Sequence, residues 1–208
     1  MSLTQPIEQG LGAMGIDLPE HLRGRLAAHL ELIEKWNRVH NLTAVRDTAQ
    51  MVVLHLLDSL TLLPHLGNAR TVIDVGSGPG FPGIPLAIAR PELSITLLDS
   101  SHKKCAFLEQ ARSELGLANI TVVCERVQQY QPEQGFDAVV SRAFAELSDF
   151  VVQSQHWAAP GGRLLAMKGV YPFEEIARVP TSHRVAQVVE LAVPSLEEKR
   201  HLVLMEAA

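Results

Sequence analysis

Apolar residues in the first third of the chain recur at the three- and four-residue spacing of an amphipathic helix. Five of them form one stripe: Leu22, Leu26, Leu30, Ile33 and Trp36. Pro19 suits the start of this helix. A second helix is predicted from about Thr48, as its N-cap, to Leu63, where Pro64 ends it. Residues 1–66 are therefore expected to form a helical extension.

From Thr71 the pattern changes to short apolar runs of the kind that form strands. Seven are predicted: Thr71–Val75, Ser94–Leu98, Ile120–Cys124, Phe136–Val140, Arg163–Met167, Val185–Val193 and His201–Met205. Helices are predicted between the earlier ones at Pro82–Ala89, Lys103–Leu115 and Glu146–Ala158. This alternation predicts an α/β Rossmann-like domain over residues 67–208, with a mostly parallel seven-stranded sheet. The short connection Pro194–Lys199 predicts an antiparallel hairpin at the sheet edge.

Composition narrows the class of protein. The 208 residues are 47% apolar and 20% charged, which suits one globular domain with an extension. Two cysteines, Cys105 and Cys124, are too few for a disulfide scaffold, and we expect both to be buried. The histidines show no HxxxH or HExxH pair, so no metal site is expected. Without a signal peptide or a membrane helix in the sequence, we expect a cytoplasmic protein with no membrane contact.

The charge balance argues against a nucleic-acid partner when it is taken alone. The chain has 18 Lys and Arg against 23 Asp and Glu, a formal net charge of −5. Proteins that bind phosphate backbones usually carry an excess of basic residues. A role in binding RNA must therefore depend on where the basic residues lie, because their number does not favour it.

The strongest local motif is Asp74-Val-Gly76-Ser-Gly78-Pro-Gly80-Phe-Pro-Gly83, between a predicted strand and a helix. Glycines let the backbone turn sharply and approach a ligand closely. The motif also fits the dinucleotide pattern G-x-G-x-x-G, but Asp74 would repel a pyrophosphate and Pro82 removes an N–H that it would use. The motif instead resembles motif I of class I methyltransferases that use S-adenosylmethionine (SAM), whose cationic methionine end would favour a nearby carboxylate. A tight turn without a ligand is the alternative.

Two later segments complete the predicted cofactor site. Asp99 ends the second strand, where a carboxylate can accept hydrogen bonds from ribose hydroxyls. It can equally cap the helix that follows, and the two roles are compatible. Val127 and Gln128 follow the third strand, where we expect backbone groups to contact the adenine.

With these residues identified, the chain resembles the bacterial small-subunit rRNA guanine-N7 methyltransferases, the RsmG or GidB family, from about residue 30 to its end. The segments that carry the resemblance are Asn41–Ala44, His55–Leu60, Asp74–Ala87, Leu97–Ser100, Lys103-Lys104, Phe107-Leu108, Ser141–Ala143 and Lys168-Gly169. The glycine loop with Phe81-Pro82-Gly83 is more specific than a general motif I.

The resemblance implies a class I methyltransferase fold and SAM as the methyl donor, with S-adenosylhomocysteine as the product. It implies SAM contacts at Gly76, Phe81, Val127, Gln128 and Arg142, to which we add Asp74, Gly78, Gly80 and Asp99. Members often have an acidic residue where this chain has Gln128, which matters little if the contact is through the backbone.

The implied substrate is 16S rRNA, free or in the small ribosomal subunit, with N7 of the guanine at position 527 in the 530 loop as the acceptor. Guanine N7 carries an exposed lone pair, so it can attack the methyl group in line without a general base. The enzyme then mainly supplies proximity and orientation. We expect a monomer.

Several side chains have both a functional and a structural interpretation. Arg142 and Lys168 end the fourth and fifth strands, and each is a candidate catalytic residue that positions substrate or SAM, or else a partner in an ion pair. His55 and Asp58 either pair with each other on one helix face or shape the RNA or SAM site. The candidate RNA-binding residues are Arg38, His40, Arg46 and His55. Lys103 and Lys104 can simply decorate the helix after Asp99.

Two other functions remain open on the sequence. One is a SAM-dependent methyltransferase with a small-molecule or protein substrate, which a deep apolar acceptor pocket without a basic rim would favour. The other is a non-catalytic nucleotide-binding module, which a failure to bind SAM would favour.

Overall fold

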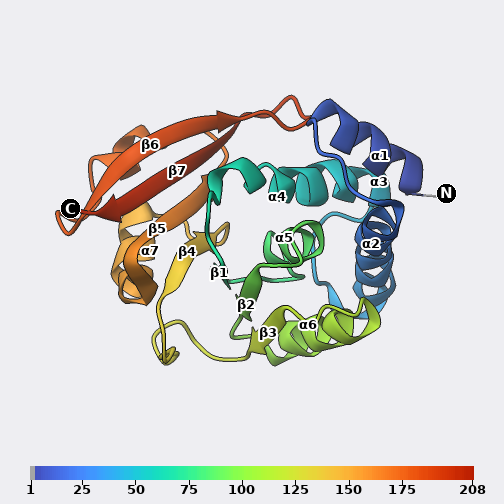
Figure 1. The fold of residues 1–208 in the computed structure, drawn as a ribbon, viewed down its shortest axis with the longest axis horizontal. Helices are drawn as coiled ribbons and strands as arrows, with labels where there is room; N and C mark the ends of the chain where they lie inside the picture. The colour runs from blue at the N-terminus through green and yellow to red at the C-terminus, as the bar shows by residue number, and fades with distance from the viewer. Residues whose placement is uncertain (1–2) are drawn as a thin grey trace.

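A seven-stranded sheet runs through the centre of the molecule in the computed structural model, which describes residues 3–208 (Figure 1). Its strands are β1 (Thr71–Val75), β2 (Ser94–Leu98), β3 (Ile120–Val123), β4 (Phe136–Ser141), β5 (Ala158–Lys168), β6 (His183–Leu191) and β7 (Arg200–Ala207). They lie in the order β3-β2-β1-β4-β5-β7-β6. The first five are parallel, and β7 runs antiparallel to both of its neighbours. The predicted parallel sheet with an antiparallel edge hairpin is confirmed.

Helices cover the two faces of this sheet unequally. The first face carries α1 (Thr4–Ala13), α2 (Glu20–His40), α3 (Thr48–Met51), the π-helical η1 (Val52–Leu57), α4 (Asp58–Leu60), the 3₁₀ turn η2 (Leu63–His65), α5 (Gly83–Ala89) and α6 (His102–Glu114). The second face carries α7 (Leu147–Ser154) and the 3₁₀ turn η3 (Gln155–Trp157). The short α8 (Phe173–Ile176) follows β5. In Figure 1 the early helices gather at one end of the molecule and the β6–β7 hairpin lies at the other.

Alternation along the strands divides the core in two. Val72 of β1 points toward the helices of the first face and belongs to the same apolar cluster as Leu30 and Leu56. Its neighbour Ile73 points the other way, into a cluster with Phe150 and Trp157. Successive residues of a strand face opposite sides, so a strand buried on both faces is apolar throughout. The first cluster joins the early helices to the sheet without a break.

The predicted second helix is present but differs from the prediction at both its start and its middle. Asp47, and not Thr48, is the N-cap, and its carboxylate accepts a hydrogen bond from the Ala49 N–H at 3.2 Å. From Val52 to Leu57 the helix widens into a π-helix. Such π-helical turns are rare in proteins, and those that occur are often at functional sites. The widened turn changes which side chains of this segment can meet.

Strand boundaries were predicted well where apolar runs are continuous. β1 and β2 have the predicted bounds, whereas β5 begins five residues before the predicted strand, at Ala158. The pairing of β4 with β5 shifts between Phe136 and Ala138, and the early part of β5 is rich in glycine, so it lacks an apolar pattern. Within residues 3–208, none of the helices has the length and apolar character needed to cross a membrane. Cys105 is buried as expected, but Cys124 is only partly buried.

Candidate functional site

The glycine loop after β1 has a backbone that only glycine adopts without strain. Gly76, Gly78 and Gly80 have φ angles of +74°, +57° and +92°. The N–H groups of Gly76 and Ser77 donate to the Leu98 carbonyl at 2.8 and 3.1 Å. These bonds tie the loop to the end of β2 at the carboxyl edge of the sheet, where ligands bind in open α/β sheets.

Close packing adds a second reason for glycine in this loop. A Cβ atom at Gly76 would lie 2.7 Å from the Cβ of Ala143, which follows β4. A Cβ atom at Gly83 would lie 2.9 Å from the Asp74 Oδ2 atom and still closer to Leu97. At Gly76 and Gly83 the loop therefore packs against β1, β2 and the segment after β4 with no space for a side chain.

Asp74 is buried beneath the glycine loop. Its buried carboxylate accepts a hydrogen bond from the Gly83 N–H at 2.8 Å through Oδ2. Its Oδ1 atom is buried and has no hydrogen-bond partner among residues 3–208. Burial raises the pKa of Asp74 to about 7, against the lowering effect of the Gly83 N–H and of Arg142. Asp74 thus holds the start of α5 against β1.

A cavity of about 440 Å³, the loop cavity, opens at the carboxyl ends of β1, β2 and β3. Its lining residues are Gly76, Leu98, Asp99, Ser100, Lys104, Glu125, Arg126, Val127, Gln128 and Ala143. Four of the predicted cofactor residues, Gly76, Asp99, Val127 and Gln128, are therefore together in one lining. The other predicted residues of the loop, Asp74, Gly78, Gly80 and Phe81, are outside this lining and support it.

Asp99 both stabilises the loop and faces the loop cavity. Its carboxylate accepts hydrogen bonds from the N–H groups of Gly78 and Ser101, each at 2.9 Å. Lys104 Nζ lies 3.5 Å from Oδ2, and Lys104 also lines the cavity. This lysine is therefore more than an exposed side chain on the surface of α6. Each carboxylate oxygen has two acceptor sites, so Asp99 can hold the loop and still accept from a ligand. The Gln128 side chain donates to Gln153 at 2.9 Å, and Gln128 also lines the cavity.

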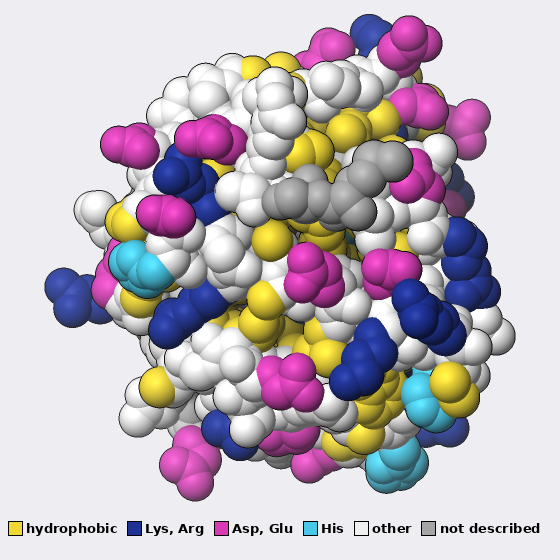
Figure 2. Space-filling model, turned by 90° about the vertical axis from the view of Figure 1, so that its right-hand side faces the viewer, with side chains coloured by type: hydrophobic (Ala, Val, Ile, Leu, Met, Phe, Trp, Pro, Cys, Tyr) yellow, Lys and Arg dark blue, Asp and Glu magenta, His cyan; other side chains and the backbone are white. Residues whose placement is uncertain are grey.

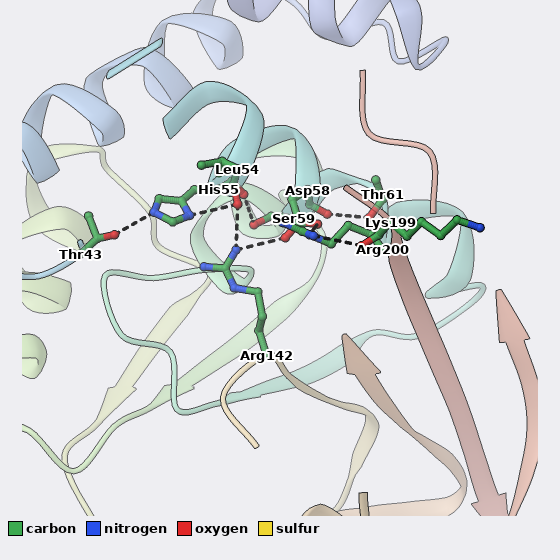
Figure 3. A network of polar contacts seen from close by, with 9 residues as sticks. All are labelled: Thr43, Leu54, His55, Asp58, Ser59, Thr61, Arg142, Lys199 and Arg200. Atoms are coloured by element: carbon green, nitrogen blue, oxygen red, sulfur yellow. Dashed lines mark hydrogen bonds and ion pairs between the residues drawn. The ribbon is translucent and has the colours of Figure 1, made fainter. Parts of the chain in front are cut away.

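A second cavity of about 450 Å³, the basic cavity, lies on the other side of the Arg142–Ala143 segment. Its lining residues are Val45, Leu54, His55, Asp58, Arg142, Met167, Lys168, Gly169 and Arg200. They come from the early helices and from the ends of β4, β5 and β7. Figure 3 shows Arg142 and Arg200 approaching the Asp58 carboxylate from different elements.

The centre of the basic cavity is an acidic side chain between two guanidinium groups. Asp58 is almost fully buried, and its Oδ2 atom lies 3.1 Å from Arg142 Nη1. Its Oδ1 atom lies 3.6 Å from Arg200 Nε. Burial raises the pKa of Asp58, and the two guanidinium groups oppose that rise. No local motif surrounds Arg200, so nothing in the sequence marked it as a site residue.

His55 does not pair with Asp58, contrary to one of the two sequence interpretations. Its Nδ1 donates to the Leu54 carbonyl at 3.0 Å, so Nε2 accepts from the Thr43 hydroxyl at 2.9 Å. Burial, and then the charge of Arg142, lower the pKa of His55 to about 4. His55 is therefore neutral at pH 7.

Phe81 connects the glycine loop to the basic cavity. Its buried ring lies between two histidine rings, with centroids 5.0 Å from His29 and 4.8 Å from His55. The Arg142 guanidinium carbon lies 5.6 Å from the ring centroid. A change at Phe81 would therefore disturb both cavities.

Lys168 lines the basic cavity, but its ammonium group is fully engaged. It donates to the carbonyls of Phe144 and Ala145, at 3.1 and 2.6 Å, and pairs with Glu175 Oε2 at 2.6 Å. These three partners match the three donors of an ammonium group. The structure therefore favours the ion-pair interpretation of Lys168, which fixes the segment after Arg142.

The predicted RNA-binding residues of the early helices are only partly at the basic cavity. His55 lines it. Arg46 is next in the chain to the lining residue Val45, and it donates to the Asn37 carbonyl at 2.9 Å and to the Asn41 side chain. Arg38 is exposed and pairs with Glu34 at 3.2 Å, and His40 packs on Trp36. On the face of the molecule that Figure 2 shows, basic and acidic side chains are interleaved. The basic side chains that line the basic cavity are Arg142, Lys168 and Arg200, and neither Arg38 nor His40 is among its lining residues.

Both the sequence and the fold of this chain are similar to those of known proteins. The model of the family described as "GidB: rRNA small subunit methyltransferase G" matches residues 23–203. The Ribosomal RNA small subunit methyltransferase G of Aromatoleum aromaticum is 54% identical over 96% of this chain and 97% of its own, and that of Nitrosospira multiformis is 49% identical over 100% and 99%. A SAM-dependent methyltransferase from Aquifex aeolicus shares the fold, with a TM-score of 0.60 and 20% identity over 74% of this chain and 92% of that chain. The chain therefore belongs to the GidB family of rRNA small subunit methyltransferases.

Proposed function

We propose that this chain transfers a methyl group from SAM to N7 of a guanine in 16S rRNA. The observation that carries the proposal is the pair of cavities on either side of the Arg142–Ala143 segment. One has a glycine-rich wall and a carboxylate suited to a nucleoside cofactor, and the other has guanidinium groups suited to RNA. A methyltransferase needs a donor site and an acceptor site that meet.

The loop cavity fits SAM by its shape and by its donor set. Gly76 presents no side chain to the cavity, and Asp99 keeps acceptor capacity for ribose hydroxyls. We expect the backbone of Val127 and Gln128, which line this cavity, to contact the adenine. SAM, when bound, supplies a methyl group on a cationic sulfonium.

The basic cavity has residues that would bind and orient the acceptor. Among residues 3–208, Nη2 of Arg142 and of Arg200 has no hydrogen-bond partner and can donate to guanine O6 or a phosphate, while Asp58 holds both guanidinium groups in place. Guanine N7 has a lone pair and no proton to lose, so its methylation needs no general base. His55 is neutral and uses both ring nitrogens in hydrogen bonds, which agrees with a role in shaping the cavity. We infer that this chemistry needs no metal and that one copy of the chain suffices.

The early helices take part in this site. We propose that residues 1–66 form an extension whose function is to wall the basic cavity, through His55 and Asp58, against the methyltransferase domain of residues 67–208. The net charge of −5 is then compatible with RNA binding, because a few basic side chains gather where the acceptor enters.

Mass mapping of rRNA tests the proposal. Purified chain would be incubated with SAM and either a 16S rRNA transcript or small subunits from cells that lack this enzyme. We expect one new N7-methylguanosine, which the resemblance places at position 527, and the better substrate of the two would show whether the target is free or assembled. Methylation at another atom, or on protein alone, would contradict the proposal.

A further inference from the structure

A short aromatic loop projects into solvent directly after β5. Its residues Val170 and Phe173 are 79% and 75% exposed, and Tyr171 between them is 39% exposed. We call the segment Val170–Phe173 the aromatic loop. Large apolar side chains that stay in water as a group are a frequent sign of a binding surface.

The aromatic loop is held in place from one side. The rings of Tyr171 and Phe173 lie with their centroids 4.2 Å apart. Tyr171 also packs edge-on against His201, at 5.5 Å and 82°. The buried His201 in turn donates from Nδ1 to the Gly169 carbonyl at 2.8 Å. The exposed Phe173 is therefore presented on a fixed support.

The aromatic loop adjoins the basic cavity in two ways, through its neighbours in the chain and through the residue that it packs against. Lys168 and Gly169, which precede it in the chain, line that cavity. His201, which packs against Tyr171, follows the cavity residue Arg200 on β7. A ligand that leaves the basic cavity along this edge therefore passes the Tyr171 ring, which packs on the chain neighbour of Arg200.

We propose that the aromatic loop stacks on an unpaired base of the RNA that flanks the guanine in the basic cavity. The inference rests on the proposed function and names how that RNA is held. Proteins recognise single-stranded RNA by combining aromatic faces, on which bases stack, with cationic groups that follow the phosphates. Phe173 and Tyr171 supply the faces, and Arg200 supplies the nearby charge.

The charges around Phe173 favour a base over a phosphate at this point. Glu174 is exposed next to it, and its Oε2 atom lies 4.0 Å from Arg178, which pairs more closely with Glu146, at 3.3 Å. A phosphate would be repelled there, whereas a neutral base would not. The contribution of the aromatic loop to RNA affinity is therefore expected to be nearly independent of salt, unlike that of phosphate contacts.

Binding of the 16S rRNA transcript by substituted full-length chains tests the inference. We expect Phe173→Ala to weaken affinity by at least about fivefold, the lower end for loss of one stacked base. The slope of log Kd against log salt and the affinity for SAM should stay unchanged. Phe173→Leu keeps an apolar group but loses the ring face, so it should bind as weakly as Phe173→Ala. Val152→Ala removes another exposed apolar group, 60% exposed on α7, and should have no effect.

A fluorescent variant gives a direct readout. Phe173→Trp should bind normally, and its added emission should be quenched when the transcript is added, because bases that stack on an indole quench it. Unchanged affinity and methylation in Phe173→Ala would overturn the inference, as would full binding by Phe173→Leu. Weaker binding of Phe173→Ala to small subunits but not to the transcript would also overturn it and would indicate a protein partner. Failure of the unsubstituted chain to methylate either RNA would contradict the proposed function instead.

Discussion

The two cavities that meet at the Arg142–Ala143 segment are built in opposite ways. The loop cavity is shaped mainly by the backbone, through glycines with positive φ angles and N–H groups that bond to the ends of strands. The basic cavity is shaped by charged side chains from the early helices, β4, β5 and β7. The first kind of site is encoded in one short motif, and the second exists only when distant segments have packed together.

This difference also makes the two cavities sensitive to different changes. A backbone site fails when a side chain is added where none fits. A buried charged site fails when one partner is removed, because the remaining charge is left in a medium that solvates it poorly. Substitutions can therefore be chosen to break one cavity while the other is left intact.

Arg142→Ala should have the largest effect, because it removes the guanidinium group from the centre of the basic cavity. We expect methyl transfer to 16S rRNA to fall by at least about a hundredfold, the loss typical of a removed charge-stabilising donor. The affinity for SAM should fall less, since Ala143 and not Arg142 lines the loop cavity. Single-turnover methylation and calorimetric titration with SAM measure the two effects separately.

A double substitution separates function from stability in this test. Arg142→Ala leaves the Asp58 carboxylate with only the more distant Arg200, which should cost about 3 kcal/mol of stability. Adding Asp58→Asn removes the unpaired charge and should restore most of that stability in urea unfolding. If activity returned together with stability, Arg142 would be a structural ion-pair residue only.

The same contrast explains what the sequence could and could not predict. The glycine loop, Asp99 and the positions of Val127 and Gln128 follow from strand order and a local motif, and they lie together as predicted. The partners of Asp58 do not follow, because Arg142 and Arg200 are far away in the chain and only the fold brings them close. The sequence does not reveal the π-helical turn over Val52–Leu57, which changes the side chains that His55 can meet, so the alternative in which His55 pairs with Asp58 was wrong.

Gly76→Ala should break the loop cavity with the next largest effect. Position 76 has a φ of +74°, a conformation that costs a residue with a Cβ atom about 1–2 kcal/mol. The new Cβ atom would also lie only 2.7 Å from the Cβ of Ala143. We expect the affinity for SAM to fall by at least about tenfold, since roughly 1.4 kcal/mol corresponds to that factor. Calorimetric titration with SAM measures the loss.

Two matched variants separate backbone strain from crowding at this position. Gly78→Ala has a similar φ of +57°, but its nearest atom is the Gly76 carbonyl oxygen at 4.0 Å, so it should lose less affinity. Adding Ala143→Gly to Gly76→Ala removes the contact and should recover part of the binding. Equal losses in Gly76→Ala and Gly78→Ala would show that close packing against Ala143 contributes nothing.

The smallest effect concerns His29, through which α2 supports the glycine loop from outside. Its Nε2 donates to the Pro79 carbonyl at 2.9 Å, and burial lowers the pKa of His29 to about 4. An unfolded histidine titrates near 6.5, so between about pH 4 and 6.5 the unfolded chain holds a proton that the folded chain lacks. His29 therefore favours the folded state fully above about pH 6.5 and loses this contribution as the pH falls toward 4.

His29→Gln keeps an N–H donor but removes the titration. We expect the dependence of unfolding free energy on pH, measured with urea between pH 5 and 6, to decrease by about 1.4 kcal/mol per pH unit relative to the unsubstituted chain. Asp74→Asn should change it in the opposite direction, because burial raises the pKa of Asp74 to about 7 and the folded chain then holds the extra proton in this range. The same pH dependence in His29→Gln and the unsubstituted chain would mean that His29 is protonated in the folded state. In that case α2 would press a charge against the loop, and the loop cavity would depend on charged side chains as the basic cavity does.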